Sequence, residues 1–275
     1  MNNHKLASTK NGTFLRWAGS KKRLIPTLSK HWNNEYDRYV EPFAGSACLF
    51  FNLSPSHALL GDINKELILT YEQIRANTQL VLLEIKKLKK TSEDYYRIRA
   101  LDLGKLSLEE RAARFIYLNR YCFNGLYRTN SSGKFNVPYC GDDKGTMPPD
   151  ELFYKAAKLL ENAQLVSGNF EKTLSLVKKG DFVYMDPPFS VKKKNIFNEY
   201  DPSHFSSEEI SLLREWMISF NKKGIHFLVS YAESDEADFL KKGFYFEKVL
   251  VRRSIAGFIS KRKIVNEVLI YNKSI

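Results

Sequence analysis

Short apolar runs alternate with helical patterns along most of this chain, and this alternation restricts the fold more than any other feature of the sequence. The clearest helical pattern runs from residue 208 to 220, behind a capping box formed by Ser206 and Glu209. Strands that alternate with helices predict an α/β fold with a parallel, doubly wound sheet. The expected strands of that sheet are residues 38–40, 58–60, 165–166, 182–185 and 226–230.

Two parts of the chain depart from the alternation. Apolar runs at 245–251 and 264–271 have the form of a hairpin, and we expect them to add antiparallel edge strands. Residues 64–149 lack a convincing buried strand and end in a polar segment, 124–143, that is rich in Gly, Asn and Ser. The helical patterns of this region are residues 66–76, 80–89 and 108–121. We expect an inserted helical module with a loop or hairpin at its tip, where recognition residues are often found.

The charge of the chain favours an anionic partner. Lys and Arg number 43 against 31 Asp and Glu, which gives a formal net charge of +12 over 275 residues. Runs of basic residues at 86–90, 192–194 and 261–263 together suit a phosphate backbone, although each run taken singly is better interpreted as a solvated surface.

The cysteines argue against a disulfide framework and against a structural zinc site. Cys48, Cys122 and Cys140 are widely spaced and no histidine cluster accompanies them. The first residues lack the apolar core of a signal peptide, and no run reaches the roughly 18 apolar residues of a membrane span. We therefore expect a cytoplasmic protein, without a metal and without a membrane partner.

The tetrapeptide Asp186-Pro187-Pro188-Phe189 directly follows the apolar run 182–185 and favours methylation of an amino group. The lone pair of an exocyclic adenine nitrogen is delocalised into the ring, so attack on a methyl donor is easier when two acceptors draw its hydrogens toward tetrahedral geometry. The Asp186 carboxylate and the Pro187 carbonyl can be those acceptors, and the ring of Phe189 can stack on the base. The prolines fix φ and remove competing donors. A simple Pro-Pro turn remains the alternative interpretation.

A turn of small residues follows the first strand and suits a cofactor. Residues 41–47 lead into a helix, and their backbone amides can approach a ligand closely. Asp62 ends the second strand, where an acid of a nucleotide-binding sheet can hold ribose hydroxyls. With Gly45 as its one glycine, the segment is also compatible with an ordinary tight turn. No Lys follows as in a Walker motif, which disfavours nucleoside triphosphates.

Several separated motifs occur in the order seen in Dam-type DNA adenine methyltransferases, and the chain resembles that family over nearly its whole length. They are FLRWAGSK at 14–21, EPFAGS at 41–46, DIN at 62–64, LNRYCFNGLYR at 118–128, GKFNVPY at 133–139 and DPPF at 186–189. The resemblance implies a Rossmann-like class I methyltransferase sheet with an inserted, mainly helical DNA-recognition domain. This domain would lie between the cofactor motifs and the catalytic motif, which is the alpha order of motifs. It also implies transfer of a methyl group from S-adenosyl-L-methionine to adenine N6 in double-stranded DNA, with S-adenosyl-L-homocysteine as product and no metal.

The resemblance divides the chain into three parts. Residues 1–63 would be the N-terminal part of the catalytic domain with the cofactor motifs. Residues 64–149 would be the inserted target-recognition domain, with its loop or hairpin at 124–143. Residues 150–275 would complete the catalytic domain and carry the DPPF motif.

The resemblance also implies which residues bind the cofactor and carry the reaction. The cofactor contacts would be Trp17, Lys21, Phe43, Gly45, Asp62, Asn169, Phe170 and Asp186, and the catalytic residues Asp186, Pro187, Pro188 and Phe189. Lys21 suits a methionine carboxylate and Asp62 a ribose diol, while aromatic faces can accept a sulfonium by a cation–π contact. Without the resemblance, Trp17 and Phe170 would be interpreted as core residues.

The DNA contacts implied by the resemblance lie mainly in the inserted domain. They are Arg16, Arg99, Phe123, Asn124, Leu126, Arg128, Asn136 and Tyr139. Phe123 would wedge into the gap left by a flipped adenine, and Arg128 would contact a guanine edge with its guanidinium fork. Leu126 and Arg128 together match family members that read GATC. From the residues alone, packing beneath the loop remains open for Phe123 and Leu126, and a solvated charge for Arg128.

Three positions differ from the family pattern. Phe189 stands where Tyr is commoner, which keeps stacking and loses a hydroxyl. Ala47 occupies the place of a second glycine, so we expect a negative φ there. Residues 140–144 replace a Gly-Arg-Tyr-Lys stretch, which removes a possible phosphate contact.

Two other classes of function compete with DNA adenine methylation. An RNA or protein amino-group methyltransferase could use the same tetrapeptide, but would have no use for the 124–139 loop. A noncatalytic DNA-binding module would explain the charge, but would not need Trp17, Asp62 and Asp186. We expect a monomer. The sequence leaves open a restriction partner, an enzyme acting alone and a phage origin.

Overall fold

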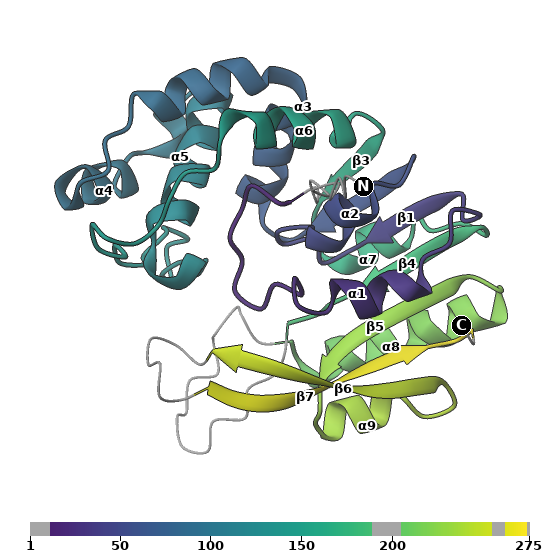
Figure 1. The fold of residues 1–275 in the computed structure, drawn as a ribbon. Helices are drawn as coiled ribbons and strands as arrows, with labels where there is room; N and C mark the ends of the chain where they lie inside the picture. Colours follow the sequence, from purple (N-terminus) through teal and green to yellow (C-terminus); the bar gives the residue numbers. More distant parts are fainter. Residues whose placement is uncertain (1–11, 189–204, 255–261, 274–275) are drawn as a thin grey trace, which may run out of the picture. The chain divides into compact units, whose positions relative to one another are not determined.

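The computed structural model describes residues 12–188, 205–254 and 262–273 (Figure 1). Its seven-stranded sheet has the order β3-β2-β1-β4-β5-β7-β6. The strands are β1 Arg38–Glu41, β2 Ala58–Asp62, β3 Ala163–Ser167, β4 Asp181–Met185, β5 His226–Ala232, β6 Tyr245–Ser254 and β7 Arg262–Tyr271. The first five are parallel to one another, which confirms the predicted α/β fold with a doubly wound sheet.

The antiparallel end of the sheet differs in detail from the expectation. Strand β7 pairs with β5 on one side and with β6 on the other, so β6 alone forms this edge. The difference has a physical cause, because β7 contains the continuous buried run Val268, Leu269 and Ile270, whereas Tyr245 and Leu250 of β6 are exposed. A strand that is apolar on both faces belongs inside a sheet.

Nine helices complete the described part of the chain. They are α1 Ile25–Leu28, α2 Cys48–Leu53, α3 Lys65–Lys86, α4 Ser92–Arg99, α5 Leu108–Tyr121, α6 Asp150–Leu160, α7 Phe170–Leu174, α8 Ser207–Lys222 and α9 Asp235–Leu240, with short 3₁₀ turns at Ser29–His31, Leu103–Lys105 and Phe123–Gly125. The two helices predicted at 66–76 and 80–89 are one helix, α3, interrupted at Asn77, where φ is −136° and ψ is 36°.

The backbone contacts divide the chain into two compact units. Among the described residues, the helical unit contains 12–25, 46–54 and 69–162, and the sheet unit contains 26–45, 55–68, 163–188, 205–254 and 262–273. The assignment of residues 64–149 to target recognition stays a prediction about function.

One hydrophobic cluster of the sheet unit lies on one face of the sheet. Helix α7 packs against β2, and α8 packs against β5 and α9 (Figure 1). The buried residues of α8 are Ile210, Leu213, Met217 and Phe220, as its helical spacing predicts. They meet alternate residues of the strands, such as Val40 and Val183. The predicted capping box is present, with Ser206 Oγ accepting from the Glu209 amide at 3.1 Å and Glu209 Oε2 from the Ser206 amide at 2.8 Å.

A cluster of apolar residues anchors the loop of the helical unit. Tyr95 and Ile98 of α4 and Tyr117 of α5 are buried against Val137. The segment that follows α5 folds back on itself through antiparallel bridges between Cys122 and Tyr139 and between Thr129 and Phe135. This is the hairpin-like form expected for the tip of the module.

The expectation of a negative φ at Ala47 is wrong. Ala47 precedes α2 with φ 47° and ψ 38°, and Gly45, two residues earlier, has φ 46°. The turn from β1 into α2 needs left-handed backbone at both positions, which costs an L residue about 1–2 kcal/mol. Alanine meets the geometry because its side chain is a single methyl group.

The described cysteines are free thiols. Cys48 and Cys122 are buried and Cys140 is partly exposed. Burial raises the pKa of Cys122 to about 11, so this thiol stays protonated.

Within the described ranges, no group of three or more His, Cys, Asp and Glu side chains is placed to hold a metal ion. None of the helices described above is both long and apolar enough to cross a membrane.

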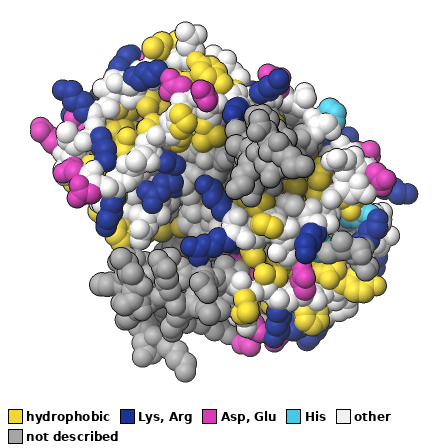
Figure 2. All heavy atoms as spheres, in the orientation of Figure 1, with side chains coloured by type: hydrophobic (Ala, Val, Ile, Leu, Met, Phe, Trp, Pro, Cys, Tyr) yellow, Lys and Arg dark blue, Asp and Glu magenta, His cyan; other side chains and the backbone are white. Residues whose placement is uncertain are grey.

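Charged side chains are distributed over the face shown in Figure 2. Lys and Arg side chains are interspersed there with acidic ones and are not confined to one patch.

Candidate active site

Three acidic residues mark the point where the strand order reverses. Glu41 ends β1, Asp62 ends the neighbouring strand β2, and Asp186 directly follows β4 on the other side. Glu41 pairs with Leu60, and the pairing of Val40 with Val183 places Tyr184 beside Glu41. Because side chains alternate along a strand, Glu41, Asp62 and Asp186 belong to the same face of the sheet. Ligands of open α/β sheets bind at such a switch point.

Asp62 ties the end of β2 to the turn after β1. Its Oδ2 accepts a hydrogen bond from the Gly45 amide and its Oδ1 one from the Asn64 amide, each at 2.9 Å. Burial raises the pKa of Asp62, while the two backbone hydrogen bonds lower it. Each carboxylate oxygen has a second lone pair, so these bonds leave the carboxylate capable of accepting from a diol.

Glu41 is a part of this site that sequence reasoning did not assign. Its side chain is buried, and Oε2 accepts a hydrogen bond from Tyr39 Oη at 3.0 Å. Burial raises the pKa of Glu41 well above its ordinary value, and the charges of Asp186 and Asp62 raise it further. The available signal was an acid at the end of a buried parallel strand.

Asp186 is held from the neighbouring strand. Its Oδ1 accepts a hydrogen bond from Ser230 Oγ of β5 at 3.0 Å. Of the prolines that follow, Pro187 is buried and Pro188 is exposed. Phe189, predicted to stack on the base, lies outside the described residues. Ser230 was not predicted, because it is 44 residues from Asp186 in the chain.

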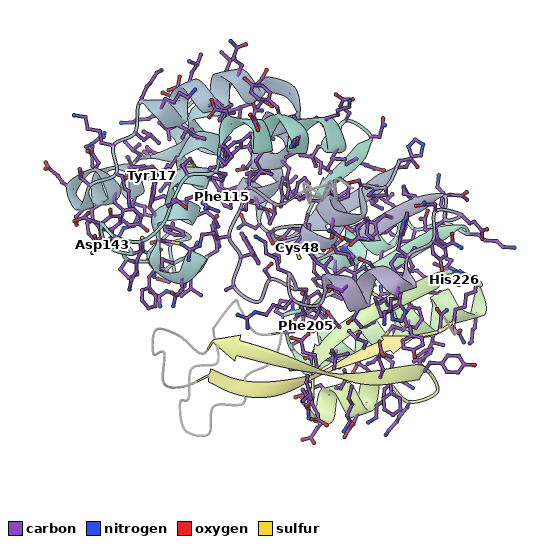
Figure 3. The ribbon with its side chains drawn as sticks, in the orientation of Figure 1. Cys48, Phe115, Tyr117, Asp143, Phe205 and His226 are labelled. Carbon is purple, nitrogen blue, oxygen red and sulfur yellow. The ribbon has the colours of Figure 1, made fainter. Side chains whose placement is uncertain are left out.

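An aromatic group lies at the same end of the sheet. Phe43 and Phe170 are stacked, with ring centroids 5.3 Å apart, and Phe205 lies 5.7 Å and 5.5 Å from them. Figure 3 labels Phe205 and also His226, which begins β5 at the opposite end. Asn169 is exposed and caps α7, with Oδ1 accepting from the Lys172 amide at 3.2 Å. No sequence pattern marked Phe205.

Trp17 and Lys21, the other predicted cofactor residues, belong to the helical unit. The ring of Trp17 stacks on Tyr127, with centroids 6.1 Å apart and an angle of 15° between the planes. Tyr127 in turn packs against Phe115, labelled in Figure 3, at 5.7 Å. Trp17 is partly exposed and Lys21 is buried. Trp17 is therefore not a residue of the buried core.

Asn119 fixes the backbone of Arg16, the first predicted DNA-reading residue. Asn119 Oδ1 accepts from the Arg16 amide at 2.8 Å, and Asn119 Nδ2 donates to the Arg16 carbonyl at 2.6 Å. The Arg16 guanidinium donates to the Arg120 carbonyl at 3.3 Å. Gly125 lies close by with φ 65°, and a Cβ there would come within 2.8 Å of Arg16 Cβ. Asn119 lies in the 118–128 motif, but no sequence pattern marked it as a residue that holds Arg16.

The predicted loop residues are accessible. Phe123 is 36% exposed and Leu126 is 37% exposed, which is inconsistent with packing beneath the loop. Asn124 has left-handed backbone, with φ 55° and ψ 17°. Arg128 Nε donates to Asn136 Oδ1 at 2.8 Å, so two predicted DNA-binding residues contact each other.

The remaining two predicted DNA contacts also have roles in the fold. Arg99 donates to the Val137 carbonyl at 3.2 Å and lies over the ring of Tyr96 at 4.7 Å. Tyr139 Oη donates to Asp142 Oδ1 at 3.0 Å, and desolvation raises the pKa of Tyr139 to about 12. Contacts of these residues with phosphate stay predictions.

Comparisons with known proteins identify the family of this chain. The family described as D12 class N6 adenine-specific DNA methyltransferase matches residues 17–255. The type II methyltransferase M1.LlaDCHI of Lactococcus lactis subsp. cremoris is 35% identical over 268 residues, which cover 94% of this chain and 94% of that protein. DNA adenine methylases of Haemophilus influenzae and Escherichia coli are 32% and 31% identical, covering 94% of this chain and 93% and 95% of their own lengths. The chain belongs to the D12 class of N6 adenine-specific DNA methyltransferases.

Proposed function

We propose that the protein methylates the adenine of GATC in duplex DNA after that adenine has left the base stack. Family membership establishes DNA adenine methylation with S-adenosylmethionine as the methyl donor. The GATC target, base flipping and the role of each residue are our proposals. The observation that carries the proposed reaction is the position of Asp186, which follows β4 at the strand-order reversal and is held by Ser230.

The residues of the sheet unit fit the methyl donor. Asp62 presents carboxylate oxygens suited to a ribose diol, and the Gly45 amide fixes that carboxylate in place. Phe43 is partly exposed and offers an aromatic surface backed by Phe170. When bound, S-adenosylmethionine supplies an electrophilic methyl group on a sulfonium. Trp17 and Lys21 remain assigned to the same cofactor by resemblance.

Asp186 and Pro187 act on the amine of the target base. The Asp186 carboxylate and the Pro187 carbonyl accept the two N6 hydrogens and so direct the nitrogen lone pair toward the methyl group. Such acceptors work by orientation and electrostatic stabilisation, because they are in place before charge develops. A base within a duplex is out of their reach, which is why the proposal includes flipping.

Positive side chains of the helical unit support binding of DNA. Burial and the charge of the nearby Arg16 guanidinium both lower the pKa of Arg120. Two neighbouring guanidinium groups repel each other, so an anion between or beside them is stabilising. Lys and Arg side chains are also exposed in Figure 2, and such cations can pair with a phosphate backbone.

The target sequence is proposed from the exposed loop. Leu126 and Arg128 are both accessible, and a guanidinium fork can make a bidentate contact to the O6 and N7 atoms of guanine. Phe123 is accessible as well and can fill the space of the displaced adenine.

Digestion of DNA from expressing cells tests the target. We expect this DNA to resist a nuclease that methylation of GATC blocks, and to be cut by a nuclease that requires that methylation. A host without its own GATC methylation and a matched Asp186→Ala plasmid are the controls. If the DNA contains N6-methyladenine but its GATC sites are not protected, the GATC target is refuted while the adenine methylation reaction is not.

A further inference from the structure

A buried chain of two hydroxyl groups leads to the carboxylate of Asp186. Ser230 Oγ donates to Asp186 Oδ1 at 3.0 Å, and Tyr184 Oη lies 3.0 Å from the same Ser230 oxygen. Met185 pairs with Val229, so Ser230 lies beside Asp186 one residue further along the two strands. Ser230 is 0% exposed and Tyr184 is 2% exposed.

The direction of this chain follows from the number of hydrogens. A serine hydroxyl has one hydrogen, and here it is donated to Asp186. Tyr184 must therefore donate to Ser230. Hydrogen bonds that run in one direction toward an anion polarise and strengthen each other.

The two prolines that follow Asp186 make its backbone surroundings different from those of Asp62. Asp62, the corresponding acid of β2, has Oδ1 held by the amide of the residue two positions later, Asn64. The residue two positions after Asp186 is Pro188, which has no N–H, and Pro187 has none either. The backbone that holds Asp62 is thus unable to hold Asp186 in the same way.

We propose that Ser230 and Tyr184 are positioning residues, which set the rotation of the Asp186 carboxylate for the adenine amino group. The proposal rests on the role proposed above for Asp186. It differs from the ordinary need of two buried hydroxyls for partners, because it requires the methylation rate to depend on Ser230 independently of folding stability.

Four variants test this role: Ser230→Ala, Tyr184→Phe, the double variant, and Tyr231→Phe. Tyr231 is the matched control, because it is a buried tyrosine of the same strand whose side chain lies in the core on the opposite face. The measurements are the single-turnover rate of methyl transfer to duplex DNA, the dissociation constant of S-adenosylmethionine and the midpoint of thermal unfolding.

Rate and stability should separate in the double variant. Ser230→Ala should slow methyl transfer roughly 10-fold to 100-fold, the range typical when a group that orients a functional side chain is lost. The dissociation constant of the cofactor should stay within about twofold, because Asp62 and Phe43, the residues proposed above to hold the cofactor, are unchanged. Tyr184→Phe should slow the reaction less. In Ser230→Ala the buried Tyr184 hydroxyl loses Ser230 as its acceptor, whereas the double variant lacks that hydroxyl. The double variant should therefore unfold at a higher temperature than Ser230→Ala, yet react no faster because Asp186 has lost the Ser230 hydrogen bond in both variants.

Several results would overturn the proposal. These are a Ser230→Ala rate within about twofold of the parent, a double variant that regains both stability and rate, or a Tyr231→Phe rate as low as that of Ser230→Ala. If Ser230→Ala does not fold, the double variant decides. Asp186→Ala, measured in the same assay, distinguishes failure of the two proposals. Full activity of Asp186→Ala would contradict the proposed role of Asp186 itself. An inactive Asp186→Ala together with a normal rate in Ser230→Ala would contradict only the positioning role of Ser230.

Discussion

Arg128 and Asn136 lie on opposite sides of the exposed loop and are joined by a hydrogen bond of 2.8 Å from Arg128 Nε to Asn136 Oδ1. The bond uses one of the five N–H groups of the guanidinium and fixes the plane of the fork. The face of the fork that carries the two terminal nitrogens is the one suited to a guanine edge.

Replacing Arg128 should change sequence discrimination more than general affinity. Arg128→Ala should lose roughly 1–3 kcal/mol of discrimination at one base pair, so near-cognate sites gain relative to GATC. Lys134→Ala, a matched loss of one positive charge in the same loop, should lower kcat/KM similarly on all DNA sequences and reduce the dependence of kcat/KM on salt concentration. The measurement is kcat/KM on GATC and on singly substituted sites at two salt concentrations. An unchanged ratio in Arg128→Ala would show that this arginine does not read sequence.

Replacing Asn136 should have a smaller effect at the same base pair. Asn136→Ala frees the guanidinium to rotate, so discrimination should fall at the position read by Arg128 and nowhere else. In an Arg128→Ala background the same substitution should cost nothing further, because coupled residues are not additive. Loss of discrimination at a different base pair would mean that Asn136 contacts DNA independently of Arg128. The measurement is kcat/KM of the parent, the two single variants and the double variant on the same set of DNA sites.

Asp186→Ala should reduce turnover by about 10²–10³, the cost of one missing preorganised polar group. Circular dichroism should show a folded protein. The assay is transfer of labelled methyl groups to duplex DNA, followed by hydrolysis and identification of N6-methyladenine. Turnover near that of the parent would contradict the assignment of Asp186 to the reacting amine.

Glu41 should make the stability of the fold depend on pH. Burial raises the pKa of Glu41 above that of an unfolded glutamate, so the folded state holds its proton to higher pH. Stability from this group is therefore present below the ordinary carboxyl pKa and is lost as the pH rises toward the raised one. Glu41→Gln cannot titrate and should match the parent in acid, then become relatively more stable toward neutral pH. Urea unfolding of both proteins across this range is the measurement, and parallel curves would contradict the prediction.

The positive φ of Ala47 should determine how substitutions there change the stability of the protein. In Ala47→Gly, relief of about 1–2 kcal/mol of left-handed strain is opposed by about 0.4–1 kcal/mol of unfolded-state entropy and about 0.8 kcal/mol for a buried methyl group. The net change should lie within about 1 kcal/mol of the parent. Ala47→Val should instead lose about 1–3 kcal/mol, because a β-branched residue fits this backbone poorly. Denaturant midpoints test the pair, and a neutral valine variant would contradict the backbone assignment.

The fold was predictable where the pattern along the chain determines it. The alternation of apolar runs with helices predicted β1 to β5, and the spacing in α8 predicted its buried face. The order of β6 and β7 was not predicted, because it depends on how two neighbouring runs compete for the centre of a sheet. The continuous run 268–270 in β7 was the available clue.

The site was predictable only in part, for a related reason. Asp62 and Asp186 could be found because each ends or follows a strand, a local feature. Ser230 and Phe205 could not, because their partners are distant in the chain and depend on strand register and packing. The backbone of Ala47 was mispredicted, because alanine ordinarily prefers a negative φ whereas the turn from β1 into α2 needs a positive φ at this position.

The close approach of Gly125 to Arg16 has a consequence for changing the target sequence of this enzyme. The two residues come from segments far apart in the chain, yet any side chain at position 125 would collide with Arg16 Cβ, and Asn119 holds the Arg16 backbone in that position. A recognition loop exchanged alone between relatives would thus meet an N-terminal segment shaped for another loop. Transplanted specificity should require both segments from the same donor, and in natural divergence the two should change as a single heritable module.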